Sequence, residues 1–368
     1  MKEKIKIYIG ILLFVITIGI MLLMHLLKTP AQYSLSERRK LEQAPSWSIG
    51  SFLDNTFTND FEAYTMDQFP FRDSFRRIKA LNNYYIFMEN DVNGIYLVDG
   101  YAAKLNYPLN EKSVGYALDK FKYIYNEYLS DKKVNIYTSV IPDKGYFAAN
   151  QKGYPAMDYE KLFSMVLEGM DYATFIDISE SLTMEDYYKT DTHWRQEKLE
   201  SVVQQIGDKM GISQELKSSY EKITTDISFY GVYYGQTALP LESEPLYYLT
   251  NDVIRGCTVF NYETGKTTSV YDLNKLEGND PYDVFLSGAT SLLTVDNPLA
   301  TTQKELILFR DSYGGSIAPL LLSAYQRITL VDIRYISSEI LEEYIEFHDQ
   351  DVLFLYSSLL LNDSYTLK

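Results

Sequence analysis

The chain has 368 residues, enough to bury a large core in one or two domains, and its hydrophobic fraction of 46% excludes a disordered protein. Its formal net charge of -16 argues against nucleic-acid binding, because phosphates are held mainly by Lys and Arg. One Cys and three His rule out an intramolecular disulfide and argue against a structural zinc, so we expect neither a metal nor a cofactor.

Tyrosine is abundant, with 34 residues in the chain. Exposed Tyr rings suit stacking on sugar rings, since the ring face is flat and apolar while the hydroxyl stays in water. The other explanation is that Tyr is favoured in strands and on half-buried surfaces. We expect most of the Tyr residues to follow this second explanation.

The N-terminus predicts a membrane anchor. Lys2, Lys4 and Lys6 precede an uncharged run at 7–27, about 21 residues, which is long enough to span a bilayer as a helix. No A-x-A-like cleavage site follows it. The positive-inside rule then places the N-terminus in the cytoplasm. We predict a signal-anchor transmembrane helix at 1–29 of a single-pass cell-membrane protein whose remainder is extracellular.

Residues 30–108 predict a helical stalk and a hairpin. After a polar linker, apolar spacing predicts a helix from Ser51 to Phe69 that Pro70 ends, and a second helix from Asp73 towards Tyr85. Arg72, just after the break, is interpreted as a residue of the helix boundary. The run at 94–98 followed by Asp99-Gly100 predicts a hairpin with a primed turn.

From residue 109 to 368, strands alternate with helices, which predicts an α/β domain with a parallel sheet flanked by helices. The predicted strands are 134–141, 174–178, 305–309, 328–332 and 352–356, and the predicted helices are 113–128, 159–170, 195–210, 316–325 and 338–347. Short Tyr-rich strands and Gly turns at about 223–300 interrupt this alternation of strands and helices. We predict that they form a β-rich insertion lying over the site.

His193 is the histidine best placed for chemistry. His25 lies in the apolar run and His348 in an acidic stretch, whereas His193 follows Asp191 by two residues and precedes Trp194. Histidine is the usual general base because its unperturbed pKa is near neutral. In an extended segment, residues i and i+2 point to one side, so Asp191 can orient the His193 ring. The other explanation is a capped start of the following helix.

Ser312 is the candidate nucleophile. It lies in the turn between the apolar strand at 305–309 and a helix, where parallel α/β sheets form their sites. Its hydroxyl can be presented there, with its N–H facing a developing oxyanion. The G-x-S-x-G elbow is absent, and an N-cap serine is the other explanation. If both residues are catalytic, we expect His193 and Ser312 within one hydrogen bond or one bridging water.

Two short stretches, residues 190–194 (Thr-Asp-Thr-His-Trp) and 310–314 (Arg-Asp-Ser-Tyr-Gly), resemble the DHHW protein family, whose relatives include the alginate O-acetylation proteins AlgX and AlgJ. Thr192 stands where that family has a second His. Weaker likenesses occur at 67–72, 142–144, 229–231 and 285–288. The resemblance implies a permuted SGNH hydrolase-like fold.

The resemblance also implies roles for individual residues. Ser312 would be the nucleophile, His193 the base and Asp191 its orienter, with the Ser312 N–H as one oxyanion donor. The second donor stays open between Gly288, Tyr313 and another residue of the insertion. The remaining candidates for contacting a polar or anionic glycan are Lys144, Arg310 and Trp194.

These observations favour a membrane-anchored extracellular serine O-acyltransferase or esterase, with acetyl as the expected acyl group and a cell-envelope polysaccharide as acceptor. The resemblance further implies a membrane-bound O-acyltransferase partner that supplies the acyl group. The alternative is a non-catalytic envelope protein that binds glycan or scaffolds an assembly, and a metal hydrolase is a distant third.

Overall fold

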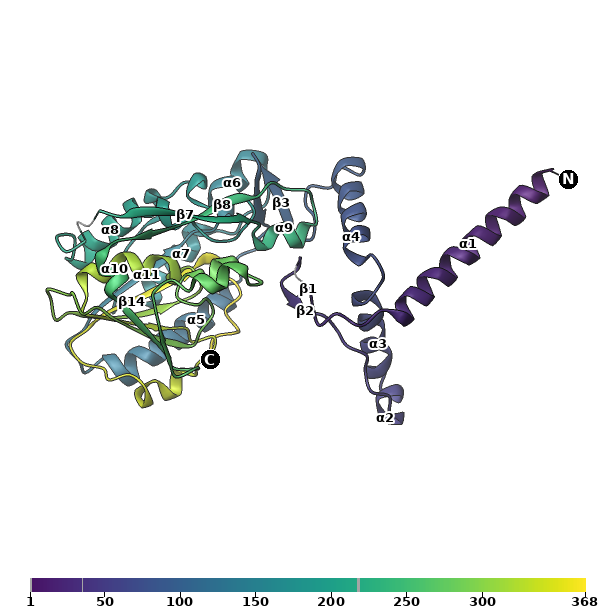
Figure 1. The fold of residues 1–368 in the computed structure, drawn as a ribbon. Helices are drawn as coiled ribbons and strands as arrows, with labels where there is room; N and C mark the ends of the chain where they lie inside the picture. The colour runs from purple at the N-terminus through teal and green to yellow at the C-terminus, as the bar shows by residue number, and fades with distance from the viewer. Residues whose placement is uncertain (1, 35, 217–218) are drawn as a thin grey trace. The chain divides into compact units, whose positions relative to one another are not determined.

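A computed structural model describes residues 2–34, 36–216 and 219–368. The chain divides into two compact units. The N-terminal unit comprises Met1–Asn93 and Tyr234–Pro240, and the sheet unit comprises Gly94–Tyr233 and Leu241–Lys368. Each unit is described separately below, and both are drawn in Figure 1.

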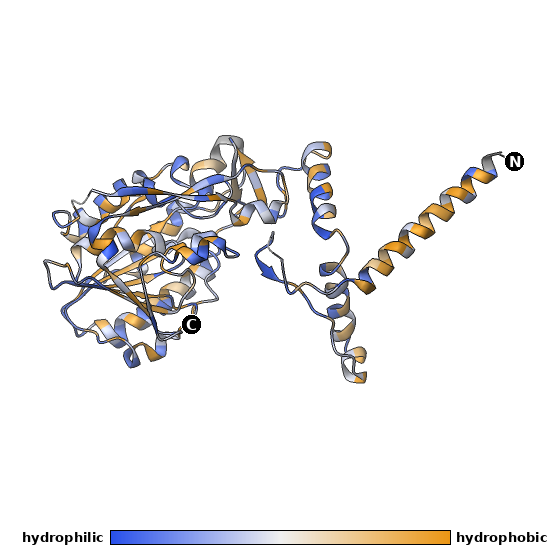
Figure 2. Ribbon diagram, in the orientation of Figure 1, coloured by the Kyte–Doolittle hydropathy of each residue, from blue (hydrophilic) through white to orange (hydrophobic). Residues whose placement is uncertain are grey.

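The N-terminal unit begins with the predicted apolar helix. Helix α1 (Lys2–Leu27) is long and apolar enough to cross a membrane, a property that N-terminal signal sequences share. Figure 2 shows apolar residues along most of its length. The other elements of Met1–Asn93 are β1 (Tyr33–Ser34), β2 (Arg39–Lys40), α2 (Ile49–Leu53), α3 (Thr56–Asp67), α4 (Arg72–Leu81) and the π-helical turn η1 (Asn82–Ile86).

The single helix predicted from Ser51 to Phe69 is two helices. Asn55, between α2 and α3, has a left-handed φ of 65° that interrupts the helical backbone. Asn is one of the few residues that adopt this conformation readily, so the break follows from the Asp54-Asn55 pair. Periodicity alone missed it because apolar spacing continues across the break.

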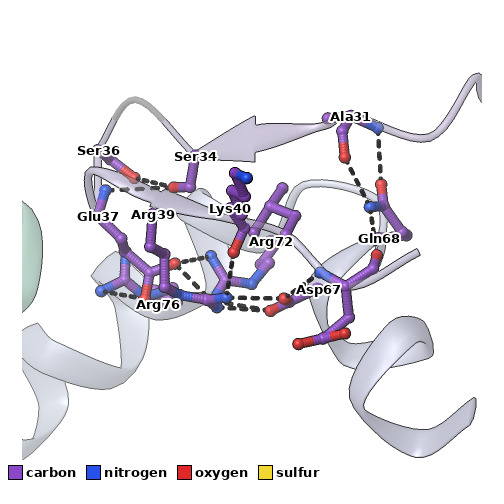
Figure 3. A network of polar contacts seen from close by, with 12 residues as sticks. Ala31, Ser34, Ser36, Glu37, Arg39, Lys40, Asp67, Gln68, Arg72 and Arg76 are labelled. Carbon is purple, nitrogen blue, oxygen red and sulfur yellow. Dashed lines mark hydrogen bonds and ion pairs between the residues drawn. The ribbon is translucent and has the colours of Figure 1, made fainter. Parts of the chain in front are cut away.

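A network of charged and amide side chains ties the linker to the junction between α3 and α4 (Figure 3). Asp67 accepts hydrogen bonds from both terminal guanidinium nitrogens of Arg39, at 2.8 and 2.6 Å. Gln68 exchanges two 2.9 Å hydrogen bonds with the backbone of Ala31. Arg72, the first residue of α4, is ion-paired with Glu37 at 2.5 Å. The segment at 67–72 therefore has a structural role.

The sheet unit is built on an eight-stranded sheet with strand order β10-β9-β11-β13-β12-β14-β5-β6. The strands from β13 to β6 are parallel, and β10, β9 and β11 are antiparallel. Their bounds are β5 (Asn135–Ile141), β6 (Thr174–Phe175), β9 (Thr258–Asn261), β10 (Lys266–Thr268), β11 (Leu292–Asp296), β12 (Glu305–Arg310), β13 (Arg327–Val331) and β14 (Asp351–Ser357). The predicted α/β class is confirmed.

Helices cover both faces of this sheet. Leu306 and Leu308 of β12 pack in one apolar cluster with α8 (Glu200–Met210) and α11 (Gly314–Leu321). Ile307 and Phe309 point the other way and pack with α5 (Glu111–Ile124) and α7 (Tyr159–Gly169). A strand buried on both faces must be apolar throughout, which explains its continuous apolar sequence.

The predicted insertion at 223–300 is only partly separate from the sheet. Strands β7 (Glu221–Phe229) and β8 (Glu244–Thr250) form their own hairpin, whereas β9, β10 and β11 extend the central sheet. The second half of the insertion is thus structural, because backbone pairing with β13 incorporates it. Residues 232–256 also contribute the short helices α9 (Val232–Thr237) and α10 (Asp252–Gly256).

Smaller elements complete the unit. The hairpin of β3 (Ile95–Val98) and β4 (Tyr101–Lys104) turns at Asp99 and Gly100, both at positive φ, as the primed turn requires. The predicted helix at 338–347 is a short 3-10 segment, Ser338–Glu343, whose backbone leaves helical geometry at Ile340 (φ -119°, ψ 15°). The remaining elements are η2 (Tyr125–Leu129), α6 (Lys144–Lys152), η3 (Ser179–Ser181), η4 (Met184–Asp186), η5 (Gln196–Lys198), η6 (Leu273–Glu277), η7 (Pro281–Val284), η8 (Leu322–Ala324) and α12 (Ser358–Leu361).

Candidate active site

The loop at 187–194 carries Asp191 and His193 and is closed at its base. Tyr187 and Trp194 form an antiparallel bridge, and the Tyr188 N–H donates to the His193 carbonyl at 3.1 Å. Between them the backbone bends, so the expectation of an extended segment is wrong. The two side chains still meet, because Asp191 Oδ1 turns back to accept the His193 backbone N–H at 3.0 Å.

The Asp191 carboxylate is buried and fully engaged. Its Oδ1 lies 2.6 Å from His193 Nδ1, and its Oδ2 accepts the Val232 N–H at 2.8 Å. Gly231 makes this approach feasible, since a Cβ there would lie 2.3 Å from the Asp191 Cα. The segment at 229–231 therefore supports the carboxylate, a role that the sequence did not predict.

Ser312 follows the central strand β12 and faces the other nitrogen of the histidine. Its Oγ lies 2.7 Å from His193 Nε2, which confirms the expected distance. Asp311 fixes the turn, because its carboxylate accepts the Tyr313 N–H at 3.0 Å and the Ser357 N–H at 2.9 Å. Gly314 is required by packing, since a Cβ would lie 2.5 Å from the Arg310 Cβ.

Together these contacts form one chain from carboxylate to hydroxyl. With the proton on Nδ1, His193 donates to Asp191 and accepts from Ser312 at Nε2. Such a chain can remove the hydroxyl proton while serine attacks a carbonyl carbon, and can return that proton to a leaving group. The catalytic roles of the three residues remain a prediction.

Aromatic side chains pack around the His193 imidazole. The sequence analysis did not predict the main one, Tyr282. The Tyr282 ring stacks on His193 with centroids 4.0 Å apart and planes 8° apart, and Tyr313 lies at 4.9 Å. The hydroxyl of Ser316 accepts from the Tyr282 hydroxyl and from Trp194 Nε1, both at 2.8 Å. No local signal distinguishes Tyr282 from the other tyrosines, because its place depends on the folding of the insertion.

The backbone N–H groups of Tyr313 and Gly288, the two named candidates for the second oxyanion donor, already donate to acceptors within the protein. The Tyr313 N–H donates to Asp311, and the Gly288 N–H donates to the Phe285 carbonyl at 3.1 Å. The Ser312 N–H, by contrast, has no acceptor among the residues that the structure describes. It is thus the donor best placed for an oxyanion at this turn.

Lys144 and Arg310 do not lie where a glycan could reach them, since they are 2% and 1% exposed. Lys144 Nζ donates to the Tyr188 carbonyl at 2.8 Å, and burial lowers its pKa to about 7. Arg310 donates to the Gly288 carbonyl at 3.3 Å and lies 3.6 Å from Asp332. Both cations therefore hold loops of the site in place.

Trp194 is also buried, with 0% exposure. Its ring packs edge-on against Tyr313 and its Nε1 bonds to Ser316, so it joins the loop at 187–194 to α11. A buried indole in this position cannot stack on a sugar. The prediction that Trp194 contacts the substrate is not supported by this geometry.

Ser312 opens onto a pocket of about 720 Å³, a size typical of ligand sites. The lining includes Lys104, Thr192, Arg334, Tyr335, Tyr365 and Lys368. None of its lining residues comes from 223–300, although Tyr282 and Val232 of that stretch contact His193 and Asp191. Instead the chain at 357–368 forms one wall.

Comparisons with known proteins agree at the level of the fold. No family model and no curated protein sequence matches the chain. A DHHW family protein from Eubacterium siraeum matches with a TM-score of 0.59 and 17% identity, covering 74% of this chain and 93% of that one. Bacillus cereus PatB1 matches with a TM-score of 0.57 and 16% identity, covering 73% and 96%, and its form with a sulfonyl adduct matches equally by TM-score.

A looser match is the O-acetyltransferase domain of Pseudomonas putida AlgJ, at a TM-score of 0.44 and 10% identity, covering 73% and 92%. The chain therefore has the fold of a DHHW family protein and of PatB1, as its two short motifs predicted.

Proposed function

We propose that this protein is a membrane-anchored serine O-acyltransferase or esterase that acts on a cell-envelope polysaccharide. The observation that carries the proposal is the unbroken chain of hydrogen bonds from Asp191 through His193 to Ser312, whose serine lines a pocket. A structural N-cap serine would need neither the histidine nor the buried carboxylate behind it.

The geometry supports a two-step mechanism. Ser312 Oγ attacks the carbonyl carbon of an acyl ester while His193 Nε2 takes its proton, and the Ser312 N–H stabilises the oxyanion. Collapse expels the donor alcohol, which receives the proton from His193, and leaves an acyl ester on Ser312. A second hydroxyl, deprotonated by His193, then takes the acyl group and regenerates the serine. A sugar hydroxyl gives transfer and water gives hydrolysis.

The pocket suits a glycan acceptor. Tyr335 and Tyr365 line it with half of their surface exposed, and aromatic faces of this kind stack on sugar rings. Lys104 and Lys368 add positive charge to the lining, while Arg334 is ion-paired with Asp332 at 2.6 Å and Asp363 also lines the pocket. We expect an acetyl group as the transferred acyl group, because the stretches at 190–194 and 310–314 resemble a family whose relatives are O-acetylation proteins.

The anchor completes the proposal. We assign α1 as an uncleaved single-pass span with a cytoplasmic N-terminus, on the basis of Lys2, Lys4 and Lys6. The sheet unit would then be extracellular, and the acyl donor would be supplied through a membrane-bound O-acyltransferase partner.

The test compares the full-length protein with Ser312→Ala in hydrolysis of a chromogenic acetyl ester. We expect a loss of at least about 1,000-fold, with Ser164→Ala, an exposed position on α7, as matched control. A sulfonyl fluoride should label wild type at Ser312, a reaction suggested by the sulfonyl adduct of PatB1. Wild type that is no faster than Ser312→Ala and is not labelled would overturn the proposal.

A non-catalytic glycan-binding role is the second candidate, favoured by the same exposed rings. It predicts that the wild-type protein binds envelope polysaccharide without turnover, and that Tyr335→Ala or Tyr365→Ala weakens binding. For the catalytic role, adding polysaccharide should divert the acetyl group from free acetate to glycan ester, measured by isotope label.

A further inference from the structure

The N-terminal unit leaves its apolar side chains uncovered. Among its described residues, the larger aliphatic side chains that are buried are Val92 and Leu239. Exposed ones occur along α1 and from Trp47 to Met88, and the group at α2 and α3 includes Trp47 at 63% exposed, Leu53 at 75% and Phe61 at 47%. Soluble surfaces rarely carry contiguous apolar patches of this kind unless something binds there.

Aromatic rings of α3 form a stripe along one side of the helix. Phe57 and Phe61 stack with centroids 5.8 Å apart, and Phe61 lies 6.2 Å from Tyr64. These positions are spaced i, i+4 and i+7, so they share a face. The polar end of α3 is satisfied within the protein, because Asp67 and Gln68 bond to the linker (Figure 3).

A contact with α1 sets the depth of this stripe. The Tyr64 ring packs edge-on against His25, with centroids 5.7 Å apart. His25 lies two residues before the end of α1, which is about 3 Å along the helix axis. If α1 spans the bilayer, Tyr64 and Phe61 lie where its apolar segment leaves the hydrocarbon. Trp, Tyr and other amphipathic groups are enriched at that boundary.

We propose that α2 and α3, from Trp47 to Tyr64, form a second membrane contact that lies in the interface of the leaflet where α1 ends. The aromatic stripe and Trp47, Phe52 and Leu53 of the α2 segment enter the boundary between headgroups and acyl chains. The inference rests on the anchor part of the proposed function. Lipid is the occupant because the α1 contact brings the stripe to lipid directly, without requiring a second protein.

The two tryptophans of the chain provide the measurement. Trp47 is exposed, whereas Trp194 is buried at 0% in the sheet unit and serves as internal reference. In full-length protein in nanodiscs, lipids brominated near the carbonyl end of their chains should quench Trp47 emission. Trp47→Phe should abolish that quenching, and Phe61→Trp in the Trp47→Phe background should restore it. Aqueous iodide should quench neither position.

The opposite result overturns the proposal: iodide quenches Trp47 and the new tryptophan, and brominated lipid does not. Protection from both quenchers also overturns it, and assigns the face to a protein. Failure of the anchor is recognised separately. Carbonate washing would release the protein, or its N-terminal sequence would begin after residue 29. Retention after the wash with iodide-accessible tryptophans refutes the interfacial contact alone.

Discussion

The two units of this chain place similar side chains in opposite surroundings. In the sheet unit, Leu308 and Phe309 are fully buried between two helical layers. In the N-terminal unit, Phe52 and Phe61 are exposed, and the linker is held by ion pairs. The difference shows that the sheet unit is stabilised by its own apolar burial, whereas the N-terminal unit depends more on charge pairing and on what surrounds it.

The pKa shifts of two carboxylates in the N-terminal unit agree with a stabilising role for charge pairing. Hydrogen bonding from Arg39 holds the pKa of Asp67 below its usual value. Burial acts to raise the pKa of Glu37, but the neighbouring Arg72, Arg76 and Arg39 lower it overall. Both carboxylates therefore stay ionised and paired at neutral pH, and these ion pairs are lost only as the pH falls through the lowered pKa values, below the usual carboxyl range.

The largest expected effect concerns the buried carboxylate of the sheet unit. Asp191→Asn keeps the shape of the side chain but removes the charge that orients His193. We expect ester turnover to fall by about 10³–10⁴-fold with little loss of folding. Steady-state kinetics on the acetyl ester measure it, with the exposed Asp119→Asn as matched control. Unchanged turnover in Asp191→Asn would remove Asp191 from the catalytic chain.

The contrast in burial is tested by truncating one apolar side chain in each unit. Leu308→Ala should lower the free energy of unfolding by about 2–5 kcal/mol, because it leaves a cavity beneath α11. Phe61→Ala should change it by less than about 0.5 kcal/mol in detergent solution. Denaturant unfolding of the full chain gives both values. A cost for Phe61→Ala as large as that for Leu308→Ala would show that the stripe is packed inside the protein.

Tyr282 distinguishes positioning of the base from simple packing. Tyr282→Leu removes the stacked ring, and we expect about a fivefold fall in kcat, from the roughly 1 kcal/mol that such aromatic pairs contribute. Tyr282→Phe keeps the ring, loses only the bond to Ser316, and should retain most activity. Equal losses in the two variants, or an effect confined to KM, would refute a positioning role.

Lys144 gives a pH-dependent effect. Burial lowers its pKa from 10.5 to about 7, so between these values the unfolded chain binds more protons than the folded one. Stability therefore rises with pH across this window, by at most about 1.4 kcal/mol per pH unit. Lys144→Met removes the titration. The stability difference between wild type and Lys144→Met should shift in favour of wild type from pH 7 to 9, and a pH-independent difference would contradict the burial.

The sequence by itself determined the features that local pattern and residue chemistry control. The apolar run identified α1, continuous apolar segments identified β5, β12, β13 and β14, and the scarcity of histidine singled out His193. The turn after β12 singled out Ser312. These predictions succeed because the pattern of apolar residues along a short segment reflects its burial and its backbone preference.

Only the tertiary structure decided which groups meet and which are already bonded. His193 and Ser312 are 119 residues apart, and the Val232 N–H reaches Asp191 only through the folded insertion. The same packing places hydrogen-bond acceptors against the N–H groups of Gly288 and Tyr313 and buries Lys144. Residues that the sequence predicted to contact a ligand therefore stabilise the loops of the site. Whether a hydrogen-bond donor is free or occupied depends on partners that are distant in sequence. The periodicity of apolar residues gives no information about these partners.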